Sequence, residues 1–433
     1  MKPRPSPTPE VRRSNSALDR RAFLRLTTLG SLALTGGCVY HPRPTQARRR
    51  RPRLLFTSGG KTCLIHADGT GQRTLELAVP GQVTWQPAGV LPDGRLLLLS
   101  LEARRDGPGR PFEEYYHQTP THVWAYDLDR EMLQELATQQ RMAPFYAPQL
   151  LLPNGRILMQ VIRRPPGQIY NMKLDGTDAR EFTGVDEGLP YGLSLSPDGT
   201  RVAFHLASPT GYQIWTSDTV GANRIRVAAH PDHLYFGPSW SPDGQWLVFQ
   251  NCLYRHDPGH DWSDVCLGRP DGSEQRVLTE GQAMWFGATY GHPRNRGGGS
   301  NVPVWTRTSQ ILFPRRLPGA KVAWEYQPHR PDTDHFNRDF RPDLACGGTE
   351  ICRLDPATGT VTALTTSEPP VWDFRACESP DGRQIAFCRA VTGGVPELWL
   401  MNADGTDLRL LTRGLADQGA DHPRWLPEAT AVS

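Results

Sequence analysis

The side chains best suited to chemistry lie in two stretches of the chain, "GHPRNRGGG" and "YQPHRPDTDHF". Imidazole nitrogens and an amide oxygen are ligands that a divalent metal ion accepts. No HExxH pattern accompanies them, so three interpretations stay open: a loop tied by its own hydrogen bonds, a ligand site, or a metal-assisted catalytic site. The candidate metal ligands are His292, Gln327, His329 and His335.

Six further side chains are candidates for binding a ligand. Aromatic faces beside arginine and histidine suit a sugar or a peptide. The six are His256, His260, Trp285, Arg294, Arg296 and Tyr326. No catalytic residue is assigned, because the chain lacks the GxSxG elbow, the P-loop and a GxGxxG motif after a strand. Whether the protein is an enzyme therefore stays open, and a divalent metal ion is the one cofactor that the residues suggest.

Short repeated turns must position these side chains. "SPDG" begins at Ser196, Ser241 and Ser379, and an apolar run follows each copy. The proline presets φ, the aspartate bonds its own backbone and the glycine takes the left-handed conformation, so each copy predicts a β-hairpin. Related turns occur in "LPDGRLLLLS" and "LPNGRILMQV".

A second kind of hairpin alternates with the first. Two β-rich runs bracket a Gly or Asp turn in each copy, so the first hairpin supplies strands A and B of a four-stranded sheet and the second supplies C and D. Recurrence at roughly 40 to 70 residues is typical of a β-propeller. The copies cover residues 61–76, 122–136, 168–182, 213–227, 264–279, 350–365 and 397–412.

The predicted fold is all-β, a seven-bladed β-propeller of four-stranded antiparallel blades over residues 52–428, with a tail at 429–433. The early run "PRLLFTS" provides one B strand and the late run "DHPRWLPE" one A strand, so pairing of these N- and C-terminal strands would close the ring. A six-bladed ring is the alternative, because the unit at residues 306–314 has lost its SPDG.

The repeat resembles the TolB-type propeller repeat over nearly all of residues 52–428. The architecture is also similar to that of the oligogalacturonate lyases, in which histidines and a glutamine from loops hold a divalent metal against a uronate. That second resemblance implies His292, Gln327 and His329 as metal ligands, with a base that removes the proton next to the carboxylate of an acidic saccharide.

Propeller connectivity separates short turns from long loops. The A–B and C–D turns open on one face, and the B–C and D–A loops on the other. The long segments 102–121, 251–264, 280–301 and 315–348 all belong to the second face, where binding residues are expected. Nine of the 13 histidines are predicted there: His117, His230, His233, His256, His260, His292, His329, His335 and His422.

The N-terminal segment predicts export. "DRRAFLR" resembles the twin-arginine motif, with Arg20 and Arg21 as the pair, and an apolar run follows it. That run ends in "LTGGC", which looks like a lipoprotein cleavage box with Cys38 as the acceptor. The resemblance implies a removed signal peptide at 1–37, an Arg- and Pro-rich tether at 38–51, and a periplasmic or other extracytoplasmic protein anchored to the membrane by lipid.

Charge and cysteine content narrow the partners. Residues 1–37 carry seven Lys and Arg against two Asp and Glu, so of the totals of 48 and 45 the remainder holds 41 and 43, a net charge of −2. Nucleic-acid binding is therefore not expected. After Cys38 the chain has seven cysteines and no CxxC pair, which favours buried free thiols, with a Cys252–Cys266 disulfide as the alternative.

These observations predict an exported, lipid-anchored propeller that binds a ligand or scaffolds proteins at the cell envelope through its His-rich loop face. Its expected partners are the membrane, through the anchor, and an envelope protein or an acidic saccharide. The alternative is a metal-dependent polysaccharide lyase, or a hydrolase, that acts on an acidic saccharide.

Overall fold

The computed structural model describes residues 51–59, 61–102, 121–140, 149–161, 168–208, 211–231, 233–253, 262–284, 301–326 and 338–427. Within these ranges the chain is all-β, as the sequence predicts, and its only helical elements are the 3-10 turns η1 (Pro342–Leu344) and η2 (Ala416–Gln418). The described residues contain no helix that is long and apolar enough to cross a membrane.

Three sheets of four strands account for the N-terminal part of the fold, and their orders are β3-β2-β1-β31, β4-β5-β6-β7 and β11-β10-β9-β8. The strands are β1 (Arg53–Ser58), β2 (Lys61–His66), β3 (Arg73–Thr74), β4 (Gln82–Val90), β5 (Leu96–Glu102), β6 (Thr121–Asp127), β7 (Met132–Gln140), β8 (Gln149–Leu151), β9 (Arg156–Val161), β10 (Gln168–Lys173), β11 (Arg180–Glu181) and β31 (Asp421–Trp425).

A 17-stranded sheet holds the next strands in chain order, and β23 (Trp324–Tyr326) pairs with β24 (Arg338–Phe340) beside it. The large sheet contains β12 (Leu189–Leu195), β13 (Arg201–Ser208), β14 (Gly211–Asp218), β15 (Ile225–Ala228), β16 (His233–Trp240), β17 (Leu247–Leu253), β18 (Trp262–Gly268), β19 (Gln275–Val277), β20 (Ala283–Met284), β21 (Val304–Trp305), β22 (Ile311–Arg316), β25 (Thr349–Leu354), β26 (Val361–Ala363), β27 (Val371–Glu378), β28 (Gln384–Val391), β29 (Glu397–Asn402) and β30 (Arg409–Leu410).

The predicted SPDG hairpins are present, and their turns form for the expected reason. In the β12–β13 turn, the Ser196 hydroxyl donates to Asp198 at 2.6 Å and the Gly199 amide donates to the Ser196 carbonyl at 2.9 Å. Gly199 has a φ of 72°, a conformation that residues with a Cβ rarely adopt. The turns at Ser241 and Ser379 repeat these contacts. The degenerate unit still forms the β21–β22 hairpin.

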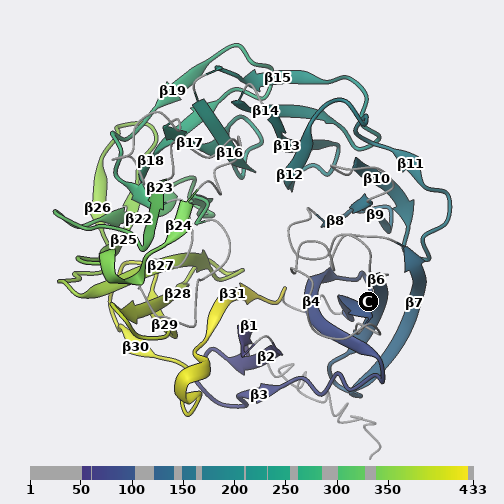
Figure 1. Cartoon of the computed structure of the whole chain (residues 1–433), viewed down its shortest axis with the longest axis horizontal. Coiled ribbons are helices and arrows are strands. Elements are labelled where there is room, and N and C mark those ends of the chain that lie inside the picture. The colour runs from purple at the N-terminus through teal and green to yellow at the C-terminus, as the bar shows by residue number, and fades with distance from the viewer. Residues whose placement is uncertain are drawn as a thin grey trace, which may run out of the picture. The chain divides into compact units, whose positions relative to one another are not determined.

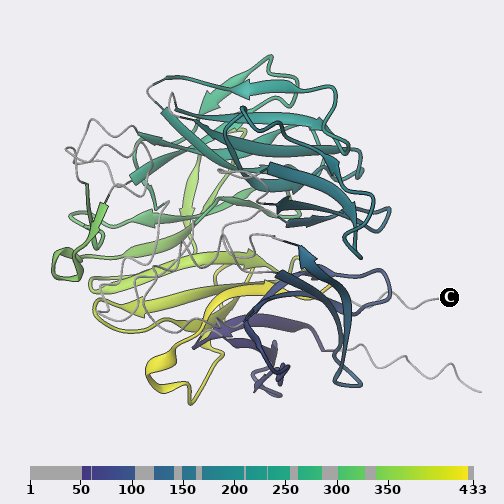
Figure 2. The ribbon, with the colours of Figure 1, turned by 45° about the vertical axis from the view of Figure 1, so that its right-hand side comes forward.

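Within the unit formed by residues 50–433, the strand groups follow one another around a ring, and β4, β8, β12, β16, β27 and β31 lie nearest its centre (Figure 1). We call these strands, together with β21, the inner strands. The last of them, β31, pairs with β1 through Leu54↔Trp425 and Leu55↔Arg424, which is the predicted pairing of an N-terminal and a C-terminal strand. Figure 2 shows the same two strands side by side from a second direction.

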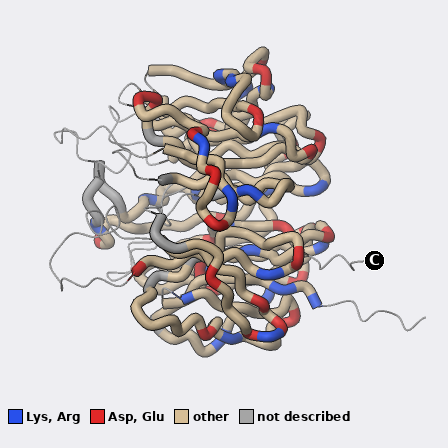
Figure 3. The backbone as a smooth tube through the Cα atoms, turned by 90° about the vertical axis from the view of Figure 1, so that its right-hand side faces the viewer, with Lys and Arg blue, Asp and Glu red and all other residues tan. Residues whose placement is uncertain are grey.

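The core lies between neighbouring sheets, and β5 shows why its sequence is continuously apolar. Leu96, Leu97, Leu98 and Leu99 are each 0% exposed. Successive side chains of a strand point to opposite faces. Leu96 and Leu98 therefore pack with Leu55 and Leu64 of the first sheet, and Leu97 and Leu99 pack with β9. Figure 3 shows Lys and Arg interspersed with Asp and Glu along the side of the fold that it draws.

Candidate functional site

Nearly all of the side chains selected from the sequence lie outside the described residues. This applies to Arg20, Arg21, Cys38, His256, His260, Trp285, His292, Arg294, Arg296, Gln327, His329 and His335. Tyr326 ends β23, and its side chain is not described. In the part of the chain that the structure describes, no group of three His, Cys, Asp or Glu residues could hold a metal ion. The proposed metal and ligand residues stay predictions.

The described histidines support the loop-face prediction only in part. His230 precedes β16 and His233 opens it, with their ring centroids 4.5 Å apart, and His233 is 2.8 Å from the Asn251 amide oxygen. His233 and His422, however, are the first residue of β16 and the second residue of β31, so both lie in strands and not in loops. That part of the prediction is wrong, because β16 begins at His233 itself and β31 begins at Asp421, one residue before His422.

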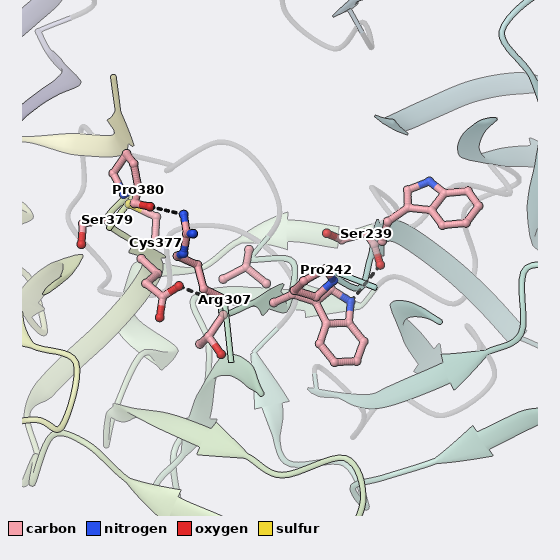
Figure 4. Close-up of a pocket in the computed structure, with 11 residues that line it drawn as sticks. Ser239, Pro242, Arg307, Cys377, Ser379 and Pro380 are labelled. Carbon is pink, nitrogen blue, oxygen red and sulfur yellow. Dashed lines mark hydrogen bonds between the residues drawn. The ribbon is translucent and has the colours of Figure 1, made fainter. Parts of the chain in front are cut away.

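A pocket lies beside the A–B turns, at the other end of the inner strands from His230 and His233. It has a cavity volume of about 540 Å³, which is in the range of small-molecule and peptide-anchor sites. Its lining comes from the ends of β16, β21 and β27 and from the turns after them, and includes Trp240, Pro242, Trp305, Arg307, Cys377 and Glu378. In Figure 4, Ser239 and Pro242 lie on one side, Ser379 and Pro380 on the other, and Arg307 between them.

The same tryptophan hydrogen bond recurs between inner strands on both sides of this pocket. Trp240 is the last residue before its turn, and its indole N–H donates to the Ser194 carbonyl of the preceding inner strand at 3.1 Å. Trp305 donates in the same way to Ser239 at 3.0 Å, and Trp425 to Cys377 at 3.1 Å. Each indole therefore fills the space between two neighbouring inner strands and satisfies one backbone carbonyl.

Glu378 occupies the corresponding position of β27. It precedes Ser379 as Trp240 precedes Ser241. Its carboxylate accepts the backbone N–H of Arg307 at 2.7 Å, and the Arg307 guanidinium donates to the Pro380 carbonyl. Burial raises the pKa of Glu378, and the hydrogen bond from Arg307 opposes that shift. The pocket thus combines a half-buried carboxyl group, an exposed arginine and two tryptophan residues.

The middle of the inner strands carries a second unusual feature, a β-bulge with a left-handed residue. In β12 and β16 that residue is glycine, Gly192 with a φ of 61° and Gly237 with a φ of 67°. In β27 and β31 it is Arg375, with a φ of 52°, and His422, with a φ of 55°. A residue with a Cβ costs about 1–2 kcal/mol in this conformation. Contacts of these two residues must offset that strain.

Asp421 provides those contacts. The Arg375 guanidinium pairs with one carboxylate oxygen, and the side chains of Arg375 and Asp421 are only 7% and 15% exposed. The other oxygen accepts the backbone N–H of His422 at 2.7 Å and lies 3.3 Å from the Cys388 sulfur. Burial alone would raise the pKa of Asp421, but Arg375 and His422 outweigh it and lower the pKa to about 2. The group is a fixed anion between the last two inner strands.

The thiols behave as the sequence favours. All seven described cysteines are free, and Cys63, Cys252, Cys266, Cys352 and Cys388 are buried. The alternative disulfide is wrong, because Cys252 lies opposite Ser263 and Cys266 opposite Phe249. Burial raises the pKa of the pocket residue Cys377 to about 12, so its thiol stays protonated at neutral pH and is not a nucleophile.

Sequence reasoning missed the pocket, although a signal for it exists. Aligning "PSWSPDG", "PVWTRTS", "ACESPDG" and "PRWLPEA" places one glutamate among three tryptophans. The signal lies in the residue before each turn and not in the turn itself.

Comparisons with curated proteins give distant sequence relatives, and no family model matches the chain. It is 24% identical over 212 residues to the uncharacterized protein Atu1656 of Agrobacterium fabrum, which covers 47% of this chain and 67% of that protein. It is 22% identical over 141 residues to the uncharacterized protein YidR of Escherichia coli, covering 29% of this chain. The match spans only 34% of YidR.

Solved structures resemble the fold more extensively. A puromycin-hydrolyzing peptidase from Mycobacterium tuberculosis has a TM-score of 0.53 at 14% identity, covering 84% of this chain and 52% of that one. A putative 6-phosphogluconolactonase from Bacteroides fragilis has a TM-score of 0.50 at 13% identity, covering 89% and 100%. TolB from Acinetobacter baumannii has a TM-score of 0.42 at 14% identity, covering 85% and 79%. The first two likenesses, with the antiparallel sheets described above, show that the fold is a β-propeller.

Proposed function

We propose that this protein is a β-propeller binding protein of the cell envelope, and that the pocket at the ends of β16, β21 and β27 holds a peptide segment of its ligand. The observation that carries the proposal is the composition of that pocket: two tryptophans, an exposed arginine and a half-buried glutamate line about 540 Å³. Aromatic residues and arginine dominate the binding energy of peptide and protein interfaces. This site supplements the loop face that the sequence favours.

A ring of seven blades is the arrangement that the strand order favours. Three sheets of four strands stand apart, and the large sheet contains the hairpin pairs that begin at β12, β16, β21 and β27. Every C–D hairpin in the sequence has its pair of strands, from β2–β3 to β29–β30. The β21–β22 hairpin, which a six-bladed ring would omit, supplies two of the residues that line the pocket, Val304 and Trp305.

The alternative of a metal-dependent lyase or hydrolase depends on His292, Gln327, His329 and His335, which lie outside the described residues. No contact among the described residues favours that alternative, so binding is the function that we propose.

Selection of peptides from a random library tests the binding site. Arg307→Ala should weaken the selected peptides about tenfold, or ~1.4 kcal/mol, because a central arginine is a typical hot spot. The matched control is Arg95→Ala, which removes an arginine from another turn of the same kind, where it bonds to Asp93 at 2.7 Å. Affinities by isothermal titration that are equal for the two variants would place the peptide elsewhere.

Export is the second part of the proposal, and "DRRAFLR" supports it. Changing Arg20 and Arg21 together to Lys should leave the precursor in the cytoplasm, because a guanidinium geometry cannot be reproduced by an ammonium group. Cell fractionation measures the result. Normal export of the double variant would contradict the twin-arginine assignment, while a Cys38→Ser variant that is exported but released from the membrane would support the anchor.

A further inference from the structure

The pocket occupies the position of a missing tryptophan. Three inner strands, β16, β21 and β31, end in an indole that bonds a carbonyl of the strand before it. The acceptors are Ser194, Ser239 and Cys377, each two residues before the first residue of its turn. By the same register, the carbonyl that an indole at position 378 would meet belongs to Val304, and Val304 lines the pocket.

Glu378 leaves that space open. A glutamate side chain is smaller than an indole, and here the backbone N–H of Arg307 holds its carboxylate. That bond engages the Oε2 oxygen, and no other described residue forms a hydrogen bond with the second carboxylate oxygen. The pocket, which Trp240 and Trp305 also line, therefore presents a half-buried carboxylate oxygen that a donor from a ligand can reach.

We infer that the pocket binds a tryptophan side chain of the ligand, whose indole takes the place that the protein's own repeat leaves empty at position 378. The indole N–H would donate to the Val304 carbonyl or to Glu378, as the resident indoles donate to their carbonyls. The ring would lie near the exposed Arg307 guanidinium, which favours an aromatic face. This inference rests on the proposed function and names the anchor of its ligand.

The protein itself suggests the decisive variant. Glu378→Trp restores the residue type that β16, β21 and β31 carry and should fill the pocket from within. We expect it to fold with an unchanged or higher Tm and to lose at least tenfold in affinity for N-acetyltryptophanamide and for selected peptides. Arg95→Ala, in a turn of the same kind outside the pocket, is the control, and its affinity should stay within about threefold of the wild type.

A second variant covers the case in which the larger side chain disturbs folding. Glu378→Leu introduces the residue that β12 carries at the same position, Leu195. It removes the acceptor and part of the space, so it should also weaken binding at least tenfold. Ligand-observed NMR with N-acetyltryptophanamide, and with N-acetylleucinamide as the control probe, measures both.

The outcomes separate this inference from the proposed function. Binding of N-acetyltryptophanamide to the wild type that Glu378→Trp abolishes supports both. Selected peptides that lack tryptophan but lose binding in Glu378→Trp would leave the binding site standing and overturn the tryptophan anchor. Wild-type protein that does not bind N-acetyltryptophanamide in preference to N-acetylleucinamide would overturn the anchor, and peptides unaffected by either variant would overturn both.

Discussion

Removal of residues 420–433 is expected to unfold the propeller or to lower its Tm by more than about 10 °C. The deletion removes β31, which pairs with β1 and buries Trp425 and Leu426. Loss of a buried tryptophan costs about 3–5 kcal/mol. It also leaves the Arg375 guanidinium, only 7% exposed, without the Asp421 carboxylate, at a further cost of about 3–5 kcal/mol.

The sum approaches the whole stability of an ordinary domain, about 5–15 kcal/mol. The control is a chain that lacks residues 1–50, which keeps every strand that the structure describes. Its Tm should stay within a few degrees of the full chain. Differential scanning calorimetry on the two truncations decides the matter, and equal melting temperatures would mean that β31 does not secure the fold.

Asp421→Asn is expected to destabilise the protein by about 3 kcal/mol or more at pH 7, because it leaves the Arg375 cation buried and without its anion. The same pair makes stability depend on pH. The carboxyl pKa is about 2 in the folded protein against a reference of 3.8, so the ionised group contributes about 2 kcal/mol. Because the folded pKa is the lower one, that contribution is complete above about pH 5 and is lost as the pH falls through 2.

Roughly half of this contribution should already be lost at pH 3, and the Asn variant should lack that part of the acid dependence. Urea unfolding between pH 7 and pH 3 measures it. The double variant Arg375→Gly with Asp421→Asn should recover part of the lost stability, because glycine suits the φ of 52° and no buried charge remains. A single variant with wild-type stability at pH 7 would show that the pair is not buried as described.

The fold could be predicted because its local signals are complete in themselves. Each SPDG turn contains the proline, the aspartate and the left-handed glycine that a hairpin needs, and the β21–β22 hairpin forms even where "TRTS" replaces them. The order of strands within a blade then predicted that the A strand in "DHPRWLPE" pairs with the B strand in "PRLLFTS". The bulges of the inner strands could be predicted less well. Arginine and histidine are not typical of the left-handed conformation, so the sequence does not mark Arg375 and His422 as bulge residues.

The candidate binding pocket could not be predicted from such local sequence signals. The pocket exists because position 378 holds a glutamate where its counterparts on neighbouring strands hold an indole, and that comparison needs the spatial register of β16, β21, β27 and β31. Asp421 and Arg375 are 46 residues apart and meet only when their strands are adjacent. The histidine-rich loops stand out in the sequence by their composition. The pocket, in contrast, is lined mostly by residue types that also occur in the core.

The pairing of β1 with β31 also determines when the first sheet can be completed during synthesis of the chain. Thr57 and Asp421, which bond across this pair, are 364 residues apart. At about 5–20 residues per second, β1 waits roughly 20 to 70 s after its own synthesis before its partner exists. Throughout that interval one edge of the first sheet is open to any strand that meets it. A nascent chain that ends before Asp421 therefore exposes the unpaired edge of β1, whereas a chain that includes β31 does not. A chaperone could recognise that edge.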